Sequence, residues 1–261
     1  MDPQPSSDQL ERYYTNGYRV EYEFPPAAQR FESDLPEAVA RVGRMTSVLT
    51  DTVRLLEVGS GSGAFLASVA PFVEMIRGVE PDVEMRRFIE RELGIDVHAS
   101  VEDAIATQGT GVFDLVVGFH VLEHVPRPVE FLQTLGRLIH PRRGRIIVEV
   151  PNVDDALVSV YQIPAYRTFY YQIAHLHYFS ALTLARTLEL AGFSAAIQPI
   201  QRYDISNHTH WLRTGQPGGQ GKYSSILNAS VNDSYAQALV QAGVSDTLLG
   251  VAGISGRSMG V

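Results

Sequence analysis

The stretch LLEVGSGSGAFL, residues 55–66, combines one carboxylate with alternating glycines, a pattern that suits a bound nucleotide-like cofactor. Glycine has no side chain, so the backbone at such a turn can approach a ligand closely. Two interpretations of the same letters compete. The turn fits the G-x-G-x-x-A dinucleotide fingerprint ending at Ala64, whereas counting from Glu57 gives the pattern E-x-G-x-G-x-G over Gly59, Gly61 and Gly63.

Glu57 separates these two interpretations. In a parallel sheet the strand before the glycine turn is buried on both faces, and a buried carboxylate is costly unless something pairs with it. A cofactor with a cationic α-amino group supplies such a partner. Glu80 ends the next apolar run, where a carboxylate accepts hydrogen bonds from the ribose hydroxyls of either cofactor class. Together the two residues favour a ribose-containing cofactor that carries a cation.

Histidines supply the candidate bases for a reaction on a hydroxyl, because the histidine pKa lies near working pH. Among the eight histidines we assign this catalytic role to His175, His120 and His177. His120 follows an apolar run, and the letters HLHYFS place the other two just before a helix N-cap at Ser180. His124, in LEHV, is interpreted as a buttress for the turn that follows the apolar run.

A second group of residues is the candidate acceptor site: Tyr178, His208, Trp211 and Arg213. An exposed tryptophan beside an arginine and a glycine-rich loop suits stacking against a sugar, and a buried structural tryptophan fits the same letters.

The two His-x-His pairs do not predict a metal site. Side chains two residues apart point the same way on a strand and diverge on a helix, and spacing fixes no third ligand. Asp154 and Asp155 are neighbours in sequence only. The predicted set of metal ligands is therefore none.

Composition excludes several classes of protein. Lys and Arg number 21 against 29 Asp and Glu, a net charge of −8, and broad nucleic-acid binding needs a basic face. The absence of cysteine rules out disulfides and thiolate zinc sites. The polar start lacks a signal-peptide pattern, and no apolar run is long enough for a membrane span. We expect a cytoplasmic enzyme with a small-molecule partner, no nucleic-acid or membrane partner, and homo-oligomerisation left open.

The elements that must position these residues alternate between short apolar runs and amphipathic helical stretches. This alternation predicts an α/β fold with a Rossmann-like, mostly parallel seven-stranded sheet and helices on both faces. Strands are expected over residues 53–58, 75–80, 95–98, 113–119, 145–150 and 245–254. Ligands bind beyond the carboxyl ends of such strands.

Two regions fall outside the alternation. Residues 1–50 are expected to form a helical segment over the cofactor site, and residues 51–261 the catalytic domain. Within that domain the tyrosine-rich insert 152–179 follows the fifth strand and is expected to form a lid. Residues 203–229 are expected to form an acceptor-side loop.

The segment FDLVVGFHVLEHVPRPVEFLQTLGRLIHPRRGRIIVEVPN, residues 113–152, resembles the block of class I S-adenosylmethionine-dependent methyltransferases in which the fourth strand ends beside the reactive methyl. The glycine turn resembles motif I of that family. The letters HLHYFSALTLARTLELAGF, residues 175–193, resemble a later block of its quinone-biosynthesis and sugar-tailoring branch. Because these blocks occur in the family's order, the resemblance implies S-adenosylmethionine as the cofactor.

The resemblance also implies cofactor-binding residues, from the methionyl end through the ribose and adenine to the methyl: Glu57, Gly59, Gly61, Gly63, Glu80, Val101, Glu102, Phe119 and His120. In the letters YYTNGYR, Tyr14 and Arg19 are candidates for a clamp on the cofactor carboxylate, with a helix that packs onto the core as the alternative.

We therefore predict a methyltransferase that acts on a hydroxyl of a sugar or sugar-containing small molecule, with a histidine as base. N- or C-methylation of another small metabolite is the alternative. The sugar C-methyltransferases of this branch carry a cysteine zinc module, which a chain without cysteine lacks. A NAD-dependent oxidoreductase and a non-catalytic cofactor-binding module are the competing classes.

Overall fold

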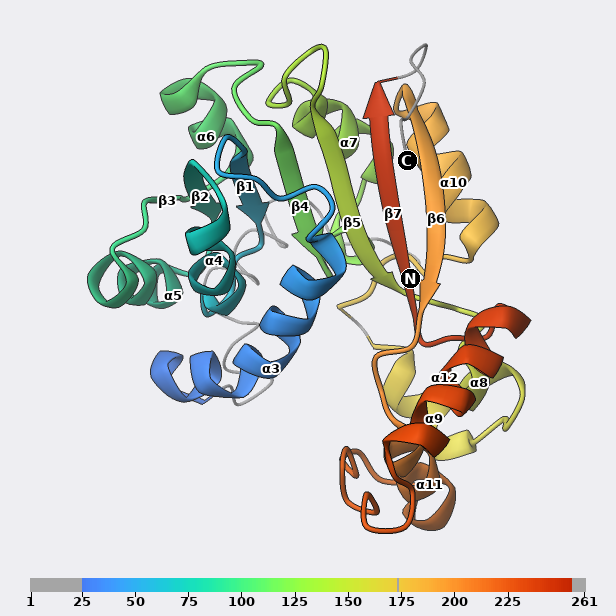
Figure 1. Ribbon diagram of the computed structural model, residues 1–261. Coiled ribbons are helices and arrows are strands. Elements are labelled where there is room, and N and C mark those ends of the chain that lie inside the picture. The colour runs from blue at the N-terminus through green and yellow to red at the C-terminus, as the bar shows by residue number, and fades with distance from the viewer. Residues whose placement is uncertain (1–24, 173, 255–261) are drawn as a thin grey trace.

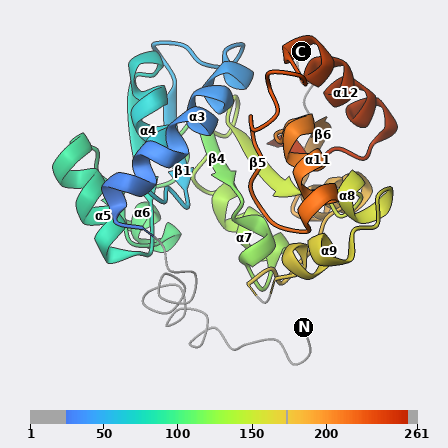
Figure 2. The same ribbon diagram turned by 90° about the horizontal axis from the view of Figure 1, so that it is seen from below.

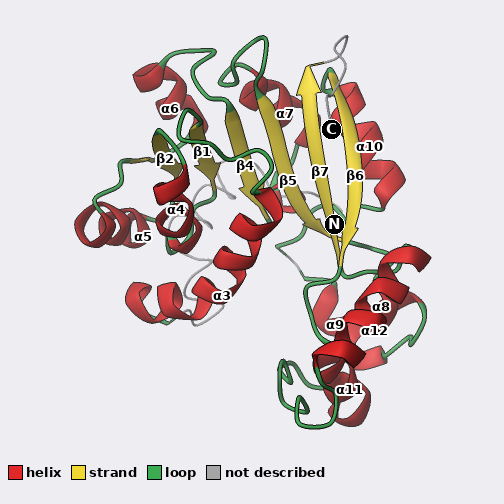
Figure 3. Cartoon of the chain, viewed as in Figure 1, coloured by secondary structure: helices red, strands yellow, loops and turns green. Residues whose placement is uncertain are grey.

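One seven-stranded sheet organises the chain (Figures 1 and 3). The computed structural model describes residues 25–172 and 174–254. The strand order is β3-β2-β1-β4-β5-β7-β6, in which β7 pairs antiparallel with both of its neighbours and the other pairs are parallel. The strands are β1 Arg54–Val58, β2 Met75–Val79, β3 Val97–His98, β4 Leu115–Phe119, β5 Arg145–Pro151, β6 Phe193–Ile200 and β7 Thr247–Ile254.

The helices begin largely where capping residues stand in the sequence. Asp82 accepts hydrogen bonds from the backbone of Glu84 and Met85, and Ser180 forms a capping box with Thr183, which satisfies amide groups that a helix start leaves unpaired. The longer helices are α3 Ala27–Met45, α4 Ala64–Val69, α5 Val83–Phe88, α6 Val101–Gln108, α7 Pro128–Gly136, α9 Pro164–Tyr170, α10 Ala181–Leu190, α11 Ile205–Thr214 and α12 Ala229–Ala242. Shorter turns are η2 Ala70–Phe72, η3 Ile89–Leu93, η4 Leu122–His124 and α8 Ala156–Ser159.

Helices cover both faces of the sheet, because consecutive strand residues point to opposite faces. Leu55 and Leu115 pack in a core with residues of α3 and α4. Leu56 and Val116, one residue further along each strand, pack in a second core with residues of α6, α7 and α10. This two-sided burial explains why the parallel strands read as continuous apolar runs.

Four helices, α8, α9, α11 and α12, gather beyond the carboxyl ends of β5 and β6 (Figures 1 and 2). We call these four helices the cap. Its core contains Leu157, Val158, Ile163, Tyr166, Tyr170 and Trp211. The segments expected to form a lid and an acceptor-side loop therefore both contribute to one small helical layer beside the sheet.

The expectation of a loop over residues 203–229 is wrong in its first half, where α11 lies. Asp204 begins this helix, since its side chain accepts a hydrogen bond of 2.7 Å from the backbone N–H of Asn207. Gly215 ends it in the left-handed conformation with φ 65°.

The predicted fold class is confirmed: the sheet is mostly parallel, helices lie on both of its faces, and a helix, α3, precedes it. Tyr14 and Arg19 lie outside the described residues. In the described part of the chain, no helix has both the length and the apolar character needed to cross a membrane.

Candidate cofactor and acceptor site

The turn between β1 and α4 requires glycine. Gly59, Gly61 and Gly63 have φ values of 76°, 51° and 79°, a region that side-chain-bearing residues rarely adopt. A Cβ on Gly59 would lie 2.5 Å from Val121 Cγ2, and one on Gly63 would lie 2.7 Å from Ile89 Cγ1. A Cβ on Gly61 would meet no described atom within 4 Å. The turn is thus packed against protein at its two ends and open to a ligand at its middle.

Glu57 lies at the end of β1, next to this turn, and its side chain is 3% exposed. Its Oε2 is buried and has no hydrogen-bond partner among the described residues. Burial raises the pKa of this carboxyl well above its ordinary value, and the guanidinium of Arg41 only partly opposes that effect. A buried carboxylate oxygen without a partner fits a ligand that brings a cationic amino group, as S-adenosylmethionine does.

Glu80, just beyond β2, is held against the glycine turn by backbone groups. The N–H of Gly61 donates to its Oε2 at 2.7 Å, and the N–H of Asp82 donates to its Oε1 at 2.8 Å. Burial raises the pKa of this carboxyl to about 7, although both backbone hydrogen bonds lower it. The carboxylate is therefore fixed in direction at the place where ribose hydroxyls are expected.

Val101 and Glu102, the expected adenine contacts, form the first turn of α6. Val101 is buried, whereas Glu102 is exposed. They follow β3, whose last residue, His98, accepts a backbone hydrogen bond of 3.0 Å from Glu80. This segment is thus the neighbour of Glu80 on the side away from β1.

Phe119 and His120 lie where β4 ends, beside the glycine turn. The guanidinium of Arg41 lies 4.4 Å from the centre of the Phe119 ring. His120 has φ 56°, a strained conformation for a residue with a side chain. Val121, the next residue, contacts the α-carbon region of Gly59. The two residues expected near the methyl therefore stand next to the predicted methionyl site.

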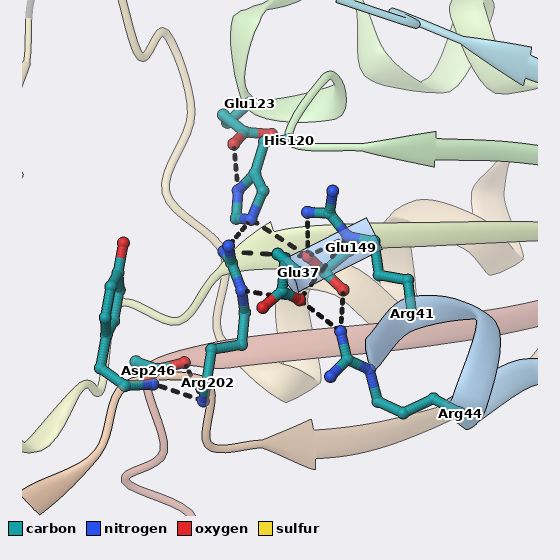
Figure 4. Close-up of polar contacts among 9 residues, drawn as sticks. Glu37, Arg41, Arg44, His120, Glu123, Glu149, Arg202 and Asp246 are labelled. Atoms are coloured by element: carbon teal, nitrogen blue, oxygen red, sulfur yellow. Dashed lines mark hydrogen bonds and ion pairs between the residues drawn. The ribbon is translucent and has the colours of Figure 1, made fainter. Parts of the chain in front are cut away.

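Charged groups face both ring nitrogens of His120 (Figure 4). Nδ1 lies 3.2 Å from Glu123 Oε1, and Nε2 lies 3.2 Å from Glu149 Oε1 and also contacts the guanidinium of Arg202. Burial and Arg202 lower the pKa of His120, but the two carboxylates outweigh them and raise it. Because both nitrogens are engaged, His120 is better placed to be held at the site than to take a proton from an acceptor.

Glu149, fully buried on β5, is the centre of a group of ion pairs that we call the ion cluster: Glu37, Arg41, Arg44, Glu149 and Arg202 (Figure 4). Its carboxylate lies 2.6 Å from Arg41, 3.5 Å from Arg44 and 3.8 Å from Arg202. Burial alone raises the pKa of Glu149, but His120 and the arginines outweigh it and lower the pKa far below its ordinary value. The ion cluster joins α3 to the carboxyl edge of the sheet.

His124 and His175 lie together, with ring centres 4.8 Å apart. His124 Nδ1 is 3.0 Å from the carbonyl oxygen of Ala174, to which it donates. His175 Nδ1 is buried without a hydrogen-bond partner in the described chain, and burial lowers the pKa of His175 to about 4, so its imidazole is neutral. His177 instead donates from Nε2 to the carbonyl oxygen of Pro126 at 3.3 Å.

A family model described as a methyltransferase domain matches residues 23–196 of this chain. The chain belongs to the methyltransferase domain family. Among curated relatives, the ubiquinone biosynthesis O-methyltransferase of Burkholderia multivorans is 29% identical over 93 residues, 34% of this chain and 40% of the relative. That of a Caulobacter species is 29% identical over 123 residues, 44% of this chain and 48% of the relative. The match thus spans less than half the length of these relatives.

Solved methyltransferase structures share the fold. An S-adenosylmethionine-dependent methyltransferase from Archaeoglobus fulgidus has a TM-score of 0.59 at 19% identity, covering 90% of this chain and 99% of that one. A possible histamine N-methyltransferase from Thermotoga maritima has a TM-score of 0.56 at 20% identity, covering 93% and 97%. DhpI, solved with S-adenosylhomocysteine, has a TM-score of 0.57 at 14% identity, covering 97% and 100%. The predicted class I methyltransferase and its cofactor, S-adenosylmethionine, are confirmed.

On the acceptor side of the methyltransferase, Trp211 corrects one expectation. It is 3% exposed, with its ring centre 4.9 Å from that of Tyr166 and 5.2 Å from that of Phe169. The tryptophan is therefore the buried structural one, and it offers no open face for stacking. It lies on α11, whose buried side packs into the cap core.

The other three expected acceptor residues have different surroundings. His208 is buried, with Nδ1 2.7 Å from the hydroxyl of Tyr235. Arg213 is exposed and donates to the hydroxyl of Tyr223 at 3.3 Å. Tyr178 is the one that lies beside a predicted base, since its ring centre is 5.6 Å from that of His175. Of the expected acceptor residues, Tyr178 is thus the one that lies beside His175, a predicted base of the methyltransferase.

Proposed function

We propose that this methyltransferase transfers the methyl group of S-adenosylmethionine to a hydroxyl of an aromatic small molecule that binds between the cap and the carboxyl edge of the sheet. The cofactor part of this proposal rests on Glu57. A carboxylate that is 3% exposed, with an oxygen lacking a partner in the described chain and an open glycine turn beside it, suits the α-amino group of that cofactor.

The aromatic acceptor is supported by two observations. The relatives are named as O-methyltransferases of ubiquinone biosynthesis. The side chains around the histidines are aromatic, since Tyr170, Tyr171 and Tyr178 contact one another with ring centres 5.0–5.4 Å apart. Trp211, the side chain expected to stack on a sugar, is buried, which removes one support for a sugar acceptor and leaves the tyrosines as the support for an aromatic one.

In this reaction the acceptor oxygen bonds to the methyl carbon as the carbon–sulfur bond breaks, and the hydroxyl gives up its proton. When bound, S-adenosylmethionine supplies an activated methyl group, so the chain has mainly to align the acceptor oxygen with it. His120 is engaged by Glu123 and Glu149, and His177 donates to a carbonyl. We assign the removal of the proton from the acceptor hydroxyl to His175. Its imidazole is neutral and has a nitrogen without a hydrogen-bond partner in the described chain.

The test is an incubation of the purified chain with S-adenosylmethionine and two acceptor panels, one of catechols and hydroxybenzoates and one of methyl glycosides. We expect S-adenosylhomocysteine and a methylated product in equal amounts from the aromatic panel. Methylation of glycosides alone would overturn the aromatic acceptor. Failure to bind S-adenosylhomocysteine in a calorimetric titration would overturn the whole proposal.

A matched pair of variants keeps this test specific. Glu57→Gln retains the size of the side chain and removes the charge that would hold the cofactor, so product formation should fall. Glu74→Gln changes a glutamate at the amino end of β2, away from the glycine turn. This variant should form product as the wild type does.

A further inference from the structure

Three potential metal ligands converge beyond the end of β4. Glu123 and His124 belong to η4, and His175 comes from the segment before α10. One ligand atom from each lies within 4.8 Å of the other two. The sequence gives no sign of this group, because it joins one histidine of a His-x-His pair to a dipeptide much earlier in the chain.

Two of these side chains have buried polar atoms that no described residue hydrogen-bonds. Glu123 is 1% exposed, and its Oε2 has no hydrogen-bond partner within residues 25–172 and 174–254. The same holds for His175 Nδ1 across the described residues. A buried carboxylate oxygen without a hydrogen bond destabilises a fold. Its presence near a second buried atom without a hydrogen bond, His175 Nδ1, points to a bound ligand.

Backbone hydrogen bonds hold together the two segments that carry these side chains. The N–H groups of Leu176 and His177 donate to the carbonyl oxygen of Glu123 at 2.8 and 3.1 Å, which ties the two segments together. His124 Nδ1 donates to the carbonyl oxygen of Ala174. That hydrogen bond fixes the tautomer in which Nε2 carries the lone pair, as in histidines that bind metals.

We propose that Glu123, His124 and His175 bind one divalent transition-metal ion. Two imidazoles and one carboxylate suit Zn²⁺ and its chemical neighbours Fe²⁺, Mn²⁺ and Co²⁺. Metal–ligand bonds of about 2.0–2.2 Å would bring the three ligand atoms closer together than the 4.8 Å within which they now lie. Three protein ligands leave at least one coordination position open.

The open position gives the ion a place in the proposed function. A metal next to the acceptor would bind the hydroxyl oxygen and make its proton easier to remove. His175 then acts as a metal ligand in place of the free base, and the proton of the metal-bound hydroxyl leaves to solvent water. This use of the ion rests on the proposed function, whereas the binding of the ion does not.

The first experiment measures metal binding without cofactor or acceptor. The full chain, with any histidine tag removed, is stripped with chelator, dialysed and titrated with Co²⁺, while the visible d–d absorption is recorded. We expect one equivalent of Co²⁺ per chain, displaced by Zn²⁺. A titration that gives no d–d band overturns the proposal.

Variants then locate the ion. Glu123→Gln and His175→Asn should each weaken Co²⁺ binding at least tenfold, and His175, which is less buried than Glu123, covers the case in which the first variant does not fold. His140→Asn is the matched control, since His140 lies at the amino end of β5. Equal affinity in wild type and His175→Asn, or an equal loss in His140→Asn, overturns the assignment. If Co²⁺ binds as expected and no hydroxyl is methylated, the metal site is supported and the proposed function is the part that fails.

Discussion

Replacing Glu149 by Gln removes the charge at the centre of the ion cluster and should strongly destabilise the fold. The carboxylate is 0% exposed and lies 2.6 Å from Arg41 and 3.5 Å from Arg44, whose side chains are 15% and 27% exposed. The guanidinium groups cannot turn freely to water, so the variant leaves three arginines with Glu37 as the one remaining carboxylate of the ion cluster. Removing one partner of a buried ion pair costs about 3–5 kcal/mol.

The free energy of unfolding, measured in urea at neutral pH, should fall by that amount. Because 1 kcal/mol shifts the melting temperature of a chain of this size by about 2–4 °C, the melting temperature should fall by about 6–20 °C. Glu130→Gln is the matched control. The pair between Glu130 and Arg127 is 64% and 76% exposed, and exposed pairs contribute about 1 kcal/mol at most.

The dependence on pH gives an independent check with a definite sign. The pKa of Glu149 is lowered in the folded protein, so its contribution to stability is complete above the pKa of an unfolded glutamate and is lost as the pH falls toward the folded value. The difference between wild type and variant should therefore shrink below about pH 4.5. A loss under about 1 kcal/mol at neutral pH, or a difference that does not shrink in acid, would refute a stabilising ion cluster.

Three further predictions concern the cofactor site, each read by calorimetric titration with S-adenosylhomocysteine. Glu57→Gln should weaken binding by about 10–100-fold, the equivalent of one charge-assisted hydrogen bond; unchanged affinity would remove Glu57 from the site. Gly59→Ala should abolish measurable binding, because the new Cβ would lie 2.5 Å from Val121 at φ 76°, and retained binding would show that the turn relaxes. The affinity of wild type should rise as the pH rises through about 7, the pKa to which burial raises Glu80, since the ionised carboxylate accepts from ribose hydroxyls; Glu80→Gln should flatten this profile.

The parallel half of the sheet could be predicted because burial on two faces leaves a clear mark in sequence. The strands expected over 53–58, 113–119 and 145–150 differ from β1, β4 and β5 by no more than two residues at either end. Apolar runs bounded by glycine or proline carry that information. The same logic identified Glu57, since a carboxylate in such a run needs a partner.

Helix α11 could not be predicted in this way, because its buried side is polar. Ser206, Asn207, His208 and His210 are all buried there beside Trp211. Apolar periodicity, which identifies most helices, is therefore missing. The start of the helix is marked only by its N-cap residue, Asp204. For the same reason the sequence left both an exposed and a buried Trp211 open, and the structure shows the buried one.

The ion cluster was missed because no local pattern describes it. Its members come from α3, from β5 and from the residue that follows β6 by two positions, Arg202. One signal was available. Glu149 interrupts the buried run RIIVEV as Glu57 interrupts RLLEV, and it could have been treated as a second carboxylate in need of a cation. Which cation it finds depends on tertiary structure alone.

The position of β7 has a consequence for synthesis on the ribosome. This strand lies between β5 and β6 and pairs with both, although it follows α11 and α12 in the chain. The nascent chain must therefore hold β6 unpaired, and the edge of β5 open, until residues 247–254 emerge. Exposed strand edges invite association with other chains, and pairing across a long sequence separation is slow. The edges of β5 and β6 are therefore open to wrong pairing at a stage when the cofactor-binding half of the sheet has already been synthesised.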